Sequence, residues 1–375
     1  MHILYDHQIF SYQKFGGASR YFAELMNVLD ATREAQFTLG VAASPNEYLA
    51  QSRFYQGERD TQAGTGPFLR RYARNEWRFR QLARQQPFDV LHATFYDPSV
   101  LHSVRGSKLV VTVLDMIPER FPAFFDVTSL YGRFVTRRWI EGKRLLCQRA
   151  DAIIAISQST KDDLVSFYGV APERVTVVHL GNRLGLTAPG APLAGMPSRY
   201  VLFVGTRNTY KNFGPFIEAA AAAVHADPGL EVVCIGGGAF SEEEHALLRQ
   251  HDLAGRVQQR NVADGDIAAC YAHAEVFVFP SLYEGFGIPI LEAFSCGCPT
   301  LLARASSFPE IAGDAALYFD PQTPGSMAAA LTRLLGDAAL RDQLRARGRA
   351  RAAEFTWERT TARTLDIYRA LEATP

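Results

Sequence analysis

The sequence predicts an α/β protein with two domains, each built from successive strand–loop–helix units. Three observations carry this prediction. The chain has 375 residues, of which 47% are apolar, and this is enough to fill two hydrophobic cores. Short apolar runs that end in glycine or polar residues recur along the chain, and helical patterns follow them. Residues 185–198, GLTAPGAPLAGMPS, are rich in Gly, Pro and Ala, so they are the best candidate for a linker between the domains.

The predicted strands are the apolar runs, taken in chain order. In the first domain, expected at residues 1–190, they are 2–5, 37–42, 88–93, 109–114, 152–156 and 175–179. In the second domain, expected at 196–357, they are 200–204, 232–235, 260–262, 276–279 and 300–303. Helical patterns are expected at 18–29, 68–85, 327–335, 338–354 and 358–371. The segments 6–15 and 44–67 are expected to be a loop and an irregular surface excursion.

Cysteine usage and hydropathy predict a reduced, cytoplasmic protein. The five cysteines form no CxxC pair, and an odd number without a framework argues against a disulfide-bonded secreted protein. The first residues, MHILYDHQIF, lack a basic region followed by an apolar core, which is the pattern of a signal peptide. No apolar run reaches the length of about 18 residues that a membrane-spanning helix needs. No nucleic-acid motif is recognised, so nucleic acid is not an expected partner.

The net charge of zero conceals a basic region in the first domain. Residues 66–150 contain 15 Lys and Arg against 7 Asp and Glu, whereas the rest of the chain contains 24 against 32. Residues 68–85, FLRRYARNEWRFRQLARQ, predict a basic amphipathic helix, and 133–149 is a second basic stretch. Helices of this type lie on anionic membrane surfaces, which would place the protein peripherally on the inner face of the plasma membrane. A domain helix with a solvated arginine face is the alternative interpretation.

The most informative stretch is residues 279–299, FPSLYEGFGIPILEAFSCGCP. An apolar run leads into a glycine turn, and Pro289 stands where a helix begins, because proline needs no N–H in the first turn. Glu284 and Glu292 have seven residues between them, so two carboxylates flank backbone N–H groups in the turn at 285–287. Carboxylates accept hydrogen bonds from pairs of hydroxyls, so the arrangement suits a sugar nucleotide. A plain strand–turn–helix with two solvated glutamates is the alternative.

Two further loops follow predicted strands and suit an anionic group. Gly16 and Gly17 open a helix after the first strand, and a helix start offers free N–H groups to an anion. In the second domain, the loop GTRNTYKNF places Arg207 and Lys211 directly after the strand at 200–204. The alternatives are a plain turn for the glycines and solvated loop cations for Arg207 and Lys211.

Candidate acceptor-side residues follow strands of the first domain. His92 ends one strand and Asp115 follows the next, and ligands of open α/β sheets bind beyond the carboxyl ends of strands. His92 also fits a structural role. Asp264 and Asp266 form a DxD pattern before a predicted helix, where capping explains them better than metal binding. The sequence therefore predicts no metal and no cofactor.

The stretch at 279–299 resembles the E-x7-E signature of retaining GT-B glycosyltransferases of family 4. The resemblance covers nearly the whole chain and is densest in 200–320. The string at 205–212 is similar to the family's G-T-R-x-x-K-N, and TVLDMIP is similar to T-V-x-D-x-I-P, except that Leu114 stands where many relatives carry His. The resemblance implies two Rossmann-like domains that face each other across a cleft. The first would bind the acceptor and the second the sugar nucleotide, with the C-terminal helix, 358–375, packing back on the first.

The resemblance also assigns roles to single residues. Glu284 would hold the transferred sugar, and Glu292 the ribose of the nucleotide. Arg207 and Lys211 would bind the diphosphate and stabilise its charge, so that no metal is needed. Further donor contacts are implied for Gly16, Gly17, Gly285, Phe286, Gly287 and Val262.

The implied reaction is retaining transfer of a hexose from a nucleotide diphosphate sugar to a saccharide or a polyprenyl-diphosphate-linked glycan. The start, YDHQIFSYQKFGGASRYF, resembles bacterial enzymes of O-antigen and exopolysaccharide assembly, which favours mannose from GDP-mannose. GDP-deoxyhexose, UDP-hexose and dTDP-rhamnose stay open as donors. A sugar-nucleotide 2-epimerase and a catalytically silent nucleotide-sugar-binding paralogue are the alternative functions.

Overall fold

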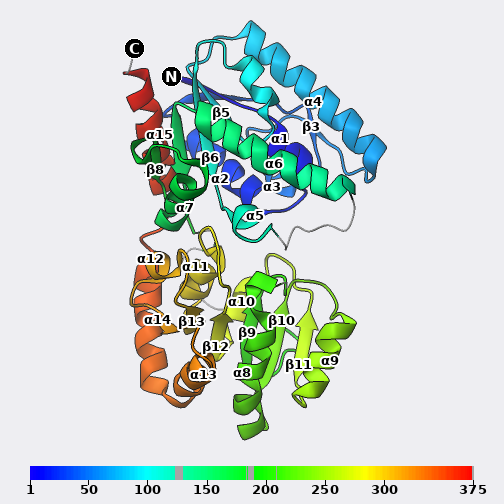
Figure 1. Ribbon diagram of the computed structural model, residues 1–375, viewed down its shortest axis with the longest axis vertical. Coiled ribbons are helices and arrows are strands. Elements are labelled where there is room, and N and C mark those ends of the chain that lie inside the picture. The colour runs from blue at the N-terminus through cyan, green and yellow to red at the C-terminus, as the bar shows by residue number, and fades with distance from the viewer. Residues whose placement is uncertain (123–129, 183, 185–189, 208, 374–375) are drawn as a thin grey trace. The chain divides into compact units, whose positions relative to one another are not determined.

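The computed structural model describes residues 1–122, 130–182, 184, 190–207 and 209–373 (Figure 1). The chain divides into two compact units. Unit 1 contains Met1–Gly181 together with Trp357–Pro375, and unit 2 contains Asn182–Thr356. Each unit has a six-stranded parallel sheet with helices, which confirms the predicted α/β class. The division after Gly181 comes before the expected linker, of which residues 185–189 lie outside the described part of the chain.

The sheet of unit 1 is parallel throughout and is buried along most of its length. Its order is β2-β1-β5-β6-β7-β8. The order changes direction at β1 and β5, so the ligand crevice typical of this class lies beyond the carboxyl ends of these two strands. The strands are β1 (His2–Tyr5), β2 (Gln36–Leu39), β5 (Val90–Ala93), β6 (Lys108–Val113), β7 (Ala152–Ala155) and β8 (Val175–Val177).

Two short helices of unit 1 lie in segments that were predicted to be irregular. The segment 6–15, expected to be a loop, contains the short helix α1 (Gln8–Tyr12), and the excursion at 44–67 contains α3 (Glu47–Ala50) and a strand pair, β3 (Ala43–Ser44) with β4 (Glu58–Arg59). These pieces are too short for a periodic signal. The other helices are α2 (Gly17–Thr32), α4 (Thr65–Gln85), α5 (Ile117–Arg120), α6 (Leu130–Arg149), α7 (Gln158–Tyr168) and α15 (Trp357–Glu372), with the 3₁₀ turns η1 (Pro98–Ser103) and η3 (Pro172–Arg174).

The sheet of unit 2 has the order β11-β10-β9-β12-β13-β14, again parallel throughout. Here the order changes direction between β9 and β12. The strand expected at 260–262 lies earlier in the chain, at Val257–Arg260, because alternating polar residues hid its start. The strands are β9 (Tyr200–Val204), β10 (Glu231–Ile235), β11 (Val257–Arg260), β12 (Val276–Phe279), β13 (Thr300–Ala303) and β14 (Leu317–Phe319).

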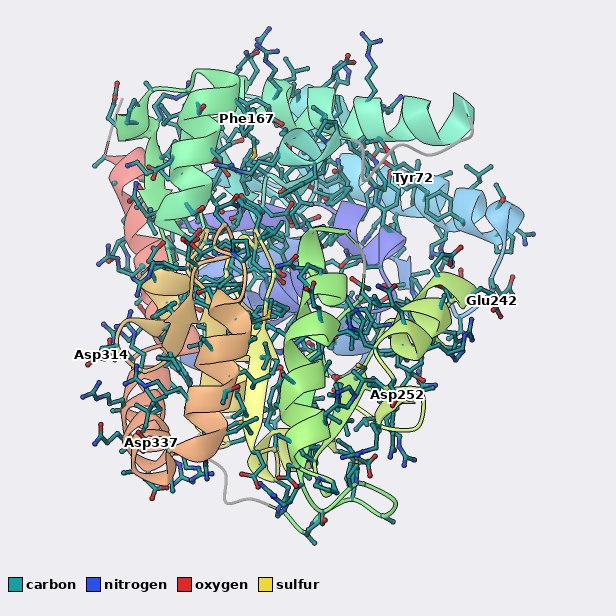
Figure 2. All side chains as sticks on the ribbon, turned by 60° about the horizontal axis from the view of Figure 1, so that its bottom comes forward. Tyr72, Phe167, Glu242, Asp252, Asp314 and Asp337 are labelled. Atoms are coloured by element: carbon teal, nitrogen blue, oxygen red, sulfur yellow. The ribbon has the colours of Figure 1, made fainter. Side chains whose placement is uncertain are left out.

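Several helix starts of unit 2 are set by local chemistry. Ser241 and Glu244 form a reciprocal capping box at the start of α9, and Asp337 caps α14 by accepting from the N–H of Leu340 at 2.9 Å. Figure 2 labels Glu242, in the first turn of α9, and Asp337. The helices are α8 (Phe213–Ala226), α9 (Glu242–Gln250), α10 (Ile267–Ala272), α11 (Ile288–Ser295), α12 (Phe308–Ala312), α13 (Ser326–Gly336) and α14 (Ala338–Ala352), with the 3₁₀ turn η4 (Thr209–Lys211).

The long helices do not include a membrane span. Within the described ranges, no helix combines the length and the apolar content that crossing a bilayer would require.

Candidate functional site

The candidate site lies at the carboxyl edge of the unit 2 sheet, where β9 and β12 are neighbours. These two strands pair directly, with Val201 opposite Val276. The loop after β9 contains Lys211, and the loop after β12 contains Glu284. Because the strand order changes direction here, this edge is the place where ligands of open α/β sheets typically bind. The fold therefore brings together two segments that are about seventy residues apart in sequence.

Lys211 and Glu284 form an ion pair at this edge of the sheet. Lys211 Nζ donates to Glu284 Oε1 at 2.5 Å, and the two side chains are only 12% and 15% exposed. The ammonium group also lies 5.3 Å from the ring centroid of Phe279, at the end of β12. A Cβ added to Gly205, at the end of β9, would lie 3.8 Å from Nζ. The ammonium group of Lys211 thus lies where the two strands end, next to the carboxylate of Glu284 and near Gly205, which has no side chain.

Arg207 points elsewhere, into the turn between β10 and α9. Its Nε donates to Glu244 Oε1 at 2.6 Å, and its Nη1 donates to the carbonyl of Gly236 at 2.8 Å. Nη2 donates to the carbonyls of Gly238 and Ala239, and the side chain is 3% exposed. These contacts make Arg207 a positioning residue for the glycine turn after β10. The structure brings Lys211 and Glu284 together, but it does not place Arg207 with them.

The glycine turn after β12 is held by two serine hydroxyls that the sequence analysis did not assign. Ser306 Oγ donates to the carbonyl of Glu284 at 2.6 Å, and Ser307 Oγ donates to the carbonyl of Phe286 at 2.8 Å. Phe286 is itself buried, and its ring meets Phe355 edge to face. The serine hydroxyls bind the carbonyls of the turn, and Phe355 packs against its aromatic side chain. These contacts restrain the turn, as a binding loop requires.

Gly287 is the residue on which this turn depends. Its φ is +105°, in the region that favours glycine, and it caps the N-terminus of α11. Pro289 follows in the first turn of that helix, as predicted, and Ile290 and Leu291 are buried. An added Cβ at Gly287 would lie 2.8 Å from Ile290 Cδ1 and 3.3 Å from Phe308 Cε1. Both the backbone conformation and the space around it therefore exclude a side chain.

Glu292 lies on α11, one turn and a half beyond Gly287, and is largely buried. Its Oε2 accepts from the hydroxyl of Tyr271 at 3.3 Å, a bond from α10 that orients the carboxylate. Tyr271 is fully buried, and its pKa is raised well above the ordinary value, first by burial and then by the charge of Glu292, so its hydroxyl stays a donor. Tyr271 was not foreseen, since it reads as a core aromatic of a short helix. Val262 lies half-buried after β11, an edge strand.

Ser281, in the loop after β12, has an unsatisfied hydroxyl. Its side chain is fully buried, yet Oγ has no hydrogen-bond partner among the residues that the structure describes. A buried polar group of this kind normally costs about 1–3 kcal/mol, so water or a ligand is the expected partner.

Gly16 and Gly17 lie at the start of α2 in unit 1, as expected. Gly16 is the N-cap, and Gln13 replaces a capping serine, because its Oε1 accepts from the N–H of Ser19 at 3.1 Å. An added Cβ at Gly17 would meet no atom within 4 Å. The helix start at Gly17 therefore has open space beside it.

His92 is a core residue of unit 1. It is fully buried, its Nδ1 bonds the hydroxyl of Tyr368 on α15 at 2.5 Å, and its Nε2 bonds Thr112 Oγ1 at 2.8 Å. Burial lowers the pKa of His92 to about 3, so the ring is neutral near pH 7. Both ring nitrogens are used within unit 1, which fits the structural role that the sequence left open for this residue.

We expect His92 to make the stability of unit 1 pH-dependent. Its folded pKa of about 3 lies below the ordinary value of about 6.5, so the unfolded chain binds the proton more tightly. The stabilisation is complete above pH 6.5 and is lost as pH falls toward 3, with about 2 kcal/mol lost by pH 5. All three tryptophans, Trp77, Trp139 and Trp357, lie in unit 1, so denaturant unfolding followed by tryptophan fluorescence measures this loss. The loss between pH 7.5 and pH 5 should be smaller by that amount in His92→Gln, and equal losses would contradict the assignment.

Asp115 and the unpredicted Asp6 lie beyond strands of unit 1. Asp115 Oδ1 accepts from the N–H of Ile117 at 3.1 Å, and its carbonyl accepts from Lys143. Asp6 follows β1 directly and is fully buried; it accepts from the N–H groups of Gln8 and Thr94 at 2.7 and 2.8 Å. Burial raises the pKa of Asp6. Asp6 thereby joins β1 to β5 at the point where the strand order changes, and its place directly after a strand was the signal that could have revealed it.

A metal site is not evident in the described part of the chain. No group of three or more His, Cys, Asp or Glu side chains there is arranged to hold a metal ion. Asp266 occupies the N-cap position of α10 but makes no side-chain capping bond. The capping interpretation of the DxD pattern is therefore right about position and wrong about the hydrogen bond.

Comparisons with known proteins agree with this geometry. Residues 15–183 match the family model "Glycosyltransferase Family 4", and residues 191–351 match "Glycosyl transferases group 1". O-antigen chain mannosyltransferase B of Escherichia coli is 29% identical over 59% of this chain and 61% of its own length. D-inositol 3-phosphate glycosyltransferase of Kineococcus radiotolerans is 32% identical over 61% of this chain and 59% of its own length. The matches thus span about three fifths of these relatives.

A solved structure shows the same fold over the whole chain. Sucrose-phosphate synthase of Thermosynechococcus elongatus superposes with a TM-score of 0.73 at 19% identity, and the match covers 100% of this chain and 99% of that one. The family model at residues 15–183 covers most of the unit 1 sheet, and the one at residues 191–351 covers the whole sheet of unit 2. The chain therefore belongs to the family 4 glycosyltransferases with the GT-B fold.

Proposed function

We propose that the protein is a retaining glycosyltransferase that moves a hexose from a nucleotide diphosphate sugar to a glycan acceptor. The observation that carries the proposal is the Lys211–Glu284 pair, enclosed at the junction of β9 and β12 in unit 2. The pair combines one cation for a phosphate and one carboxylate for sugar hydroxyls. A mannose donor, GDP-mannose first, is favoured by the likeness to an O-antigen mannosyltransferase.

The proposed chemistry needs few protein groups. When the donor binds, its diphosphate replaces Glu284 beside Lys211, and Glu284 turns to accept hydrogen bonds from the sugar. The acceptor oxygen bonds to the anomeric carbon on the face that the diphosphate leaves, and the electron pair of the broken C–O bond goes to the phosphate. The proton of the acceptor hydroxyl passes to a departing phosphate oxygen. Lys211 contributes by stabilising the charge that develops on the diphosphate.

The remaining donor contacts are proposed from the resemblance to the family, together with the local geometry of each residue. We assign Glu292, oriented by Tyr271, to the ribose hydroxyls, and the rigid turn of Gly285, Phe286 and Gly287 to the sugar. The open helix start at Gly16 and Gly17 is assigned to the diphosphate, and Val262 to the base. Arg207 would reach the diphosphate only by giving up its bonds in the β10–α9 turn, so we assign it to positioning.

The test is a thermal-shift screen with GDP-mannose, GDP-fucose, UDP-glucose and dTDP-rhamnose, followed by turnover with the donor that stabilises. GDP-mannose should raise the melting temperature most, and NMR of the product should show the anomeric configuration of the donor. Stabilisation without transfer to any glycan, but with conversion of the free sugar nucleotide, would indicate the epimerase. Stabilisation with no turnover at all would indicate the silent paralogue.

We expect the transfer to proceed without a divalent metal. In the proposal, the charge of Lys211 and backbone N–H groups stabilise the leaving diphosphate. Turnover after treatment with EDTA and gel filtration should stay within about twofold of the untreated rate. Strict dependence on added Mn²⁺ or Mg²⁺ would contradict this and would point to Asp264 and Asp266.

Peripheral membrane contact remains a proposal, but burial in the structure removes some of the residues that the sequence suggested for it. The expected outward arginine face of α4 is wrong at Arg71, which is buried and paired with Asp60 at 3.2 Å. Phe79 of the same helix is in the core. Leu69 and Arg70 stay exposed on α4, and α6 exposes Trp139 and Leu145 among arginines. We place the contact on the α6 face, where an acceptor carried on a polyprenyl diphosphate would be concentrated.

We expect the protein to bind anionic liposomes at low ionic strength and to release them as salt rises. Each arginine near an anionic surface contributes about 1 kcal/mol, and salt screens this attraction. Arg137→Gln, Arg144→Gln and Arg149→Gln together should weaken flotation with liposomes strongly. The control removes three exposed arginines elsewhere, Arg333, Arg347 and Arg363. Equal losses in both triple variants, or no binding by the wild type, would contradict a specific membrane face.

A further inference from the structure

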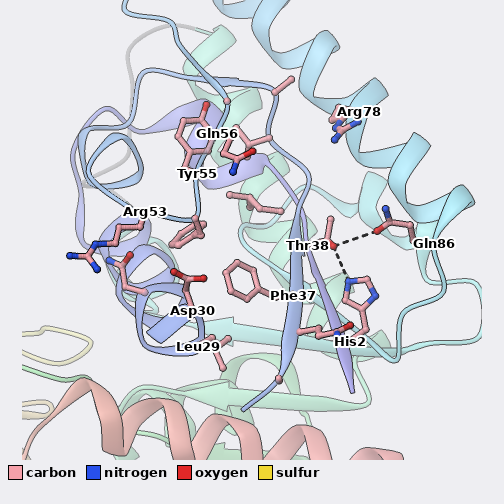
Figure 3. A pocket seen from close by; sticks show the side chains of 18 of the residues that line it. His2, Leu29, Asp30, Phe37, Thr38, Arg53, Tyr55, Gln56, Arg78 and Gln86 are labelled. Atoms are coloured by element: carbon pink, nitrogen blue, oxygen red, sulfur yellow. Dashed lines mark hydrogen bonds between the residues drawn. The ribbon is translucent and has the colours of Figure 1, made fainter. Parts of the chain in front are cut away.

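Unit 1 has a large groove along its edge strand β2, distinct from the glycine turn at Gly16–Gly17 (Figure 3). Its volume is about 1810 Å³. The groove takes in the end of α2, near Asp30, and lies about 20 Å along that helix from Gly17, given a rise of 1.5 Å per residue. It continues past β2 to the face of α4 that carries Arg74, Trp77 and Arg78.

The lining has a composition that suits sugars. Planar amide side chains predominate among the polar groups, and each places a donor beside an acceptor, as a pair of neighbouring hydroxyls requires. Aromatic rings supply flat apolar surfaces against which the C–H face of a sugar ring can lie. Trp77 is the most exposed of these, at 64%. The amides are Asn27, Gln36, Gln51, Gln56 and Gln86, and the aromatic residues are Phe37, Phe54, Tyr55 and Trp77.

The groove is basic, and part of its charge is uncompensated. Four arginines line it against a single carboxylate, that of Asp30. Arg33 pairs with Asp30 at 3.5 Å, and Arg74 pairs with Glu58 at 2.5 Å. Arg53 and Arg78 are exposed and have no ion-pair partner among the described residues. Figure 3 shows these two side chains on opposite sides of Phe37 and Thr38, so a ligand along the strand would pass between two free guanidinium groups.

The edge strand adds backbone groups to the groove. β2 lies at the edge of the sheet beside β1. The N–H of Gln36 and that of Gly40, directly after the strand, donate to the carbonyls of Met1 and Tyr5. Because hydrogen-bonding direction alternates along a parallel strand, Phe37 and Leu39 turn their N–H and C=O groups toward the groove. The side chains of Asn27, Gln36, Gln51 and Gln56 have no hydrogen-bond partner in the described part of unit 1. Many donors and acceptors are therefore available along one elongated surface.

We propose that this groove binds an acidic glycan, a chain of several sugars that carries carboxylate or phosphate groups. The aromatic rings and amides recognise the sugar rings, and Arg53 and Arg78 recognise the acidic substituents, since guanidinium groups bind carboxylate and phosphate in a bidentate way. This proposal goes beyond the proposed function. It depends on that function only for the idea that the glycan in the groove is the chain that the enzyme lengthens. A transferase that lengthens a polysaccharide would hold the chain here, away from its growing end.

The test measures binding without a sugar nucleotide, so that it is independent of catalysis. The probes are an oligomannuronate hexasaccharide and the neutral mannohexaose, titrated into the full chain by calorimetry and by tryptophan fluorescence at low salt. The acidic probe should bind at least about tenfold more tightly than the neutral one, which is a difference of about 1.4 kcal/mol. Trp77→Ala, Arg78→Gln and Arg53→Gln should each weaken its binding at least severalfold.

Arg84→Gln is the matched control, because Arg84 is an exposed arginine of the same helix that does not line the groove. It should leave binding unchanged, and an equal loss would show non-specific attraction and overturn the site. Equal or tighter binding of mannohexaose would overturn the acidic ligand. If neither glycan binds but Trp77→Ala weakens binding to anionic liposomes, the face belongs to a membrane contact and the proposal fails. Lys211→Ala should bind the acidic probe normally, which separates this proposal from the transferase reaction.

Discussion

Lys211→Ala should lower kcat/KM for sugar transfer by at least about 10²-fold, the scale for losing one group that stabilises charge in the transition state. Lys211 Nζ is the cation at the junction of β9 and β12, 2.5 Å from Glu284. Without it, the leaving diphosphate loses a partner, and Glu284 loses this ion pair in a largely enclosed position. The measurement is initial-rate kinetics with the donor that the thermal-shift screen identifies.

The control for this experiment is Arg333→Ala, since Arg333 is an exposed cation on α13 and belongs to none of the loops assigned to the donor. It should change the rate by less than about twofold, as substitutions at exposed surface sites usually do little. Near-normal turnover of Lys211→Ala would refute the assignment of the site. Arg207→Lys separates the roles of the two cations. If Arg207 positions the turn, Arg207→Lys should lower the melting temperature and the rate together, whereas Lys211→Ala should lower the rate by far more than its loss of stability explains.

Gly287→Ala should destabilise unit 2 by about 2–4 kcal/mol, the sum of a strained positive φ and of overpacking. The backbone at Gly287 has a φ of +105°, and the new methyl group would lie 2.8 Å from Ile290 Cδ1, within a fully buried cluster. The turn that carries Glu284 would have to move to relieve the contact, so donor affinity should fall too. The measurement is denaturant unfolding followed by circular dichroism, together with the donor-induced thermal shift.

A second glycine separates the two causes. Gly325 also has a positive φ, of +76°, but an added Cβ there would meet no atom within 4 Å. Gly325→Ala should therefore cost only about 1 kcal/mol from backbone strain and leave donor affinity unchanged. Equal losses of stability in the two variants would show that packing around Gly287 does not restrict the turn.

The strands of unit 2 show which elements local sequence patterns can predict. The strands β9, β12 and β13 are continuous apolar runs bounded by glycine or proline, and these signals are local, so their limits were predictable. β11 was misplaced because its sequence, VQQR, is mostly polar. It is an edge strand, and an edge strand needs fewer apolar residues than a strand buried on both faces.

The candidate site was also partly predictable. Glu284, Gly287 and Glu292 were named from the stretch at 279–299, and Lys211 from the loop after the strand at 200–204. The resemblance to the family, and not their spacing alone, gave these residues their expected roles. The partners that hold them were not. Ser306, Ser307 and Tyr271 come from other segments of the chain, and no spacing in the sequence connects them to the turn that they orient.

The sequence by itself determined the class of the protein, the order of its strand–helix units and the residue types at the candidate site, because each depends on periodicity and turn chemistry within short segments. Only the tertiary structure decided which charged groups meet. It paired Lys211 with Glu284, committed Arg207 to the carbonyls of Gly236 and Gly238, and placed His92 in the core against Tyr368, which is 276 residues away. The physical reason is that hydrogen bonds and ion pairs act over a few ångströms in space. Which partners come within that distance is set by strand order and helix packing across the whole unit.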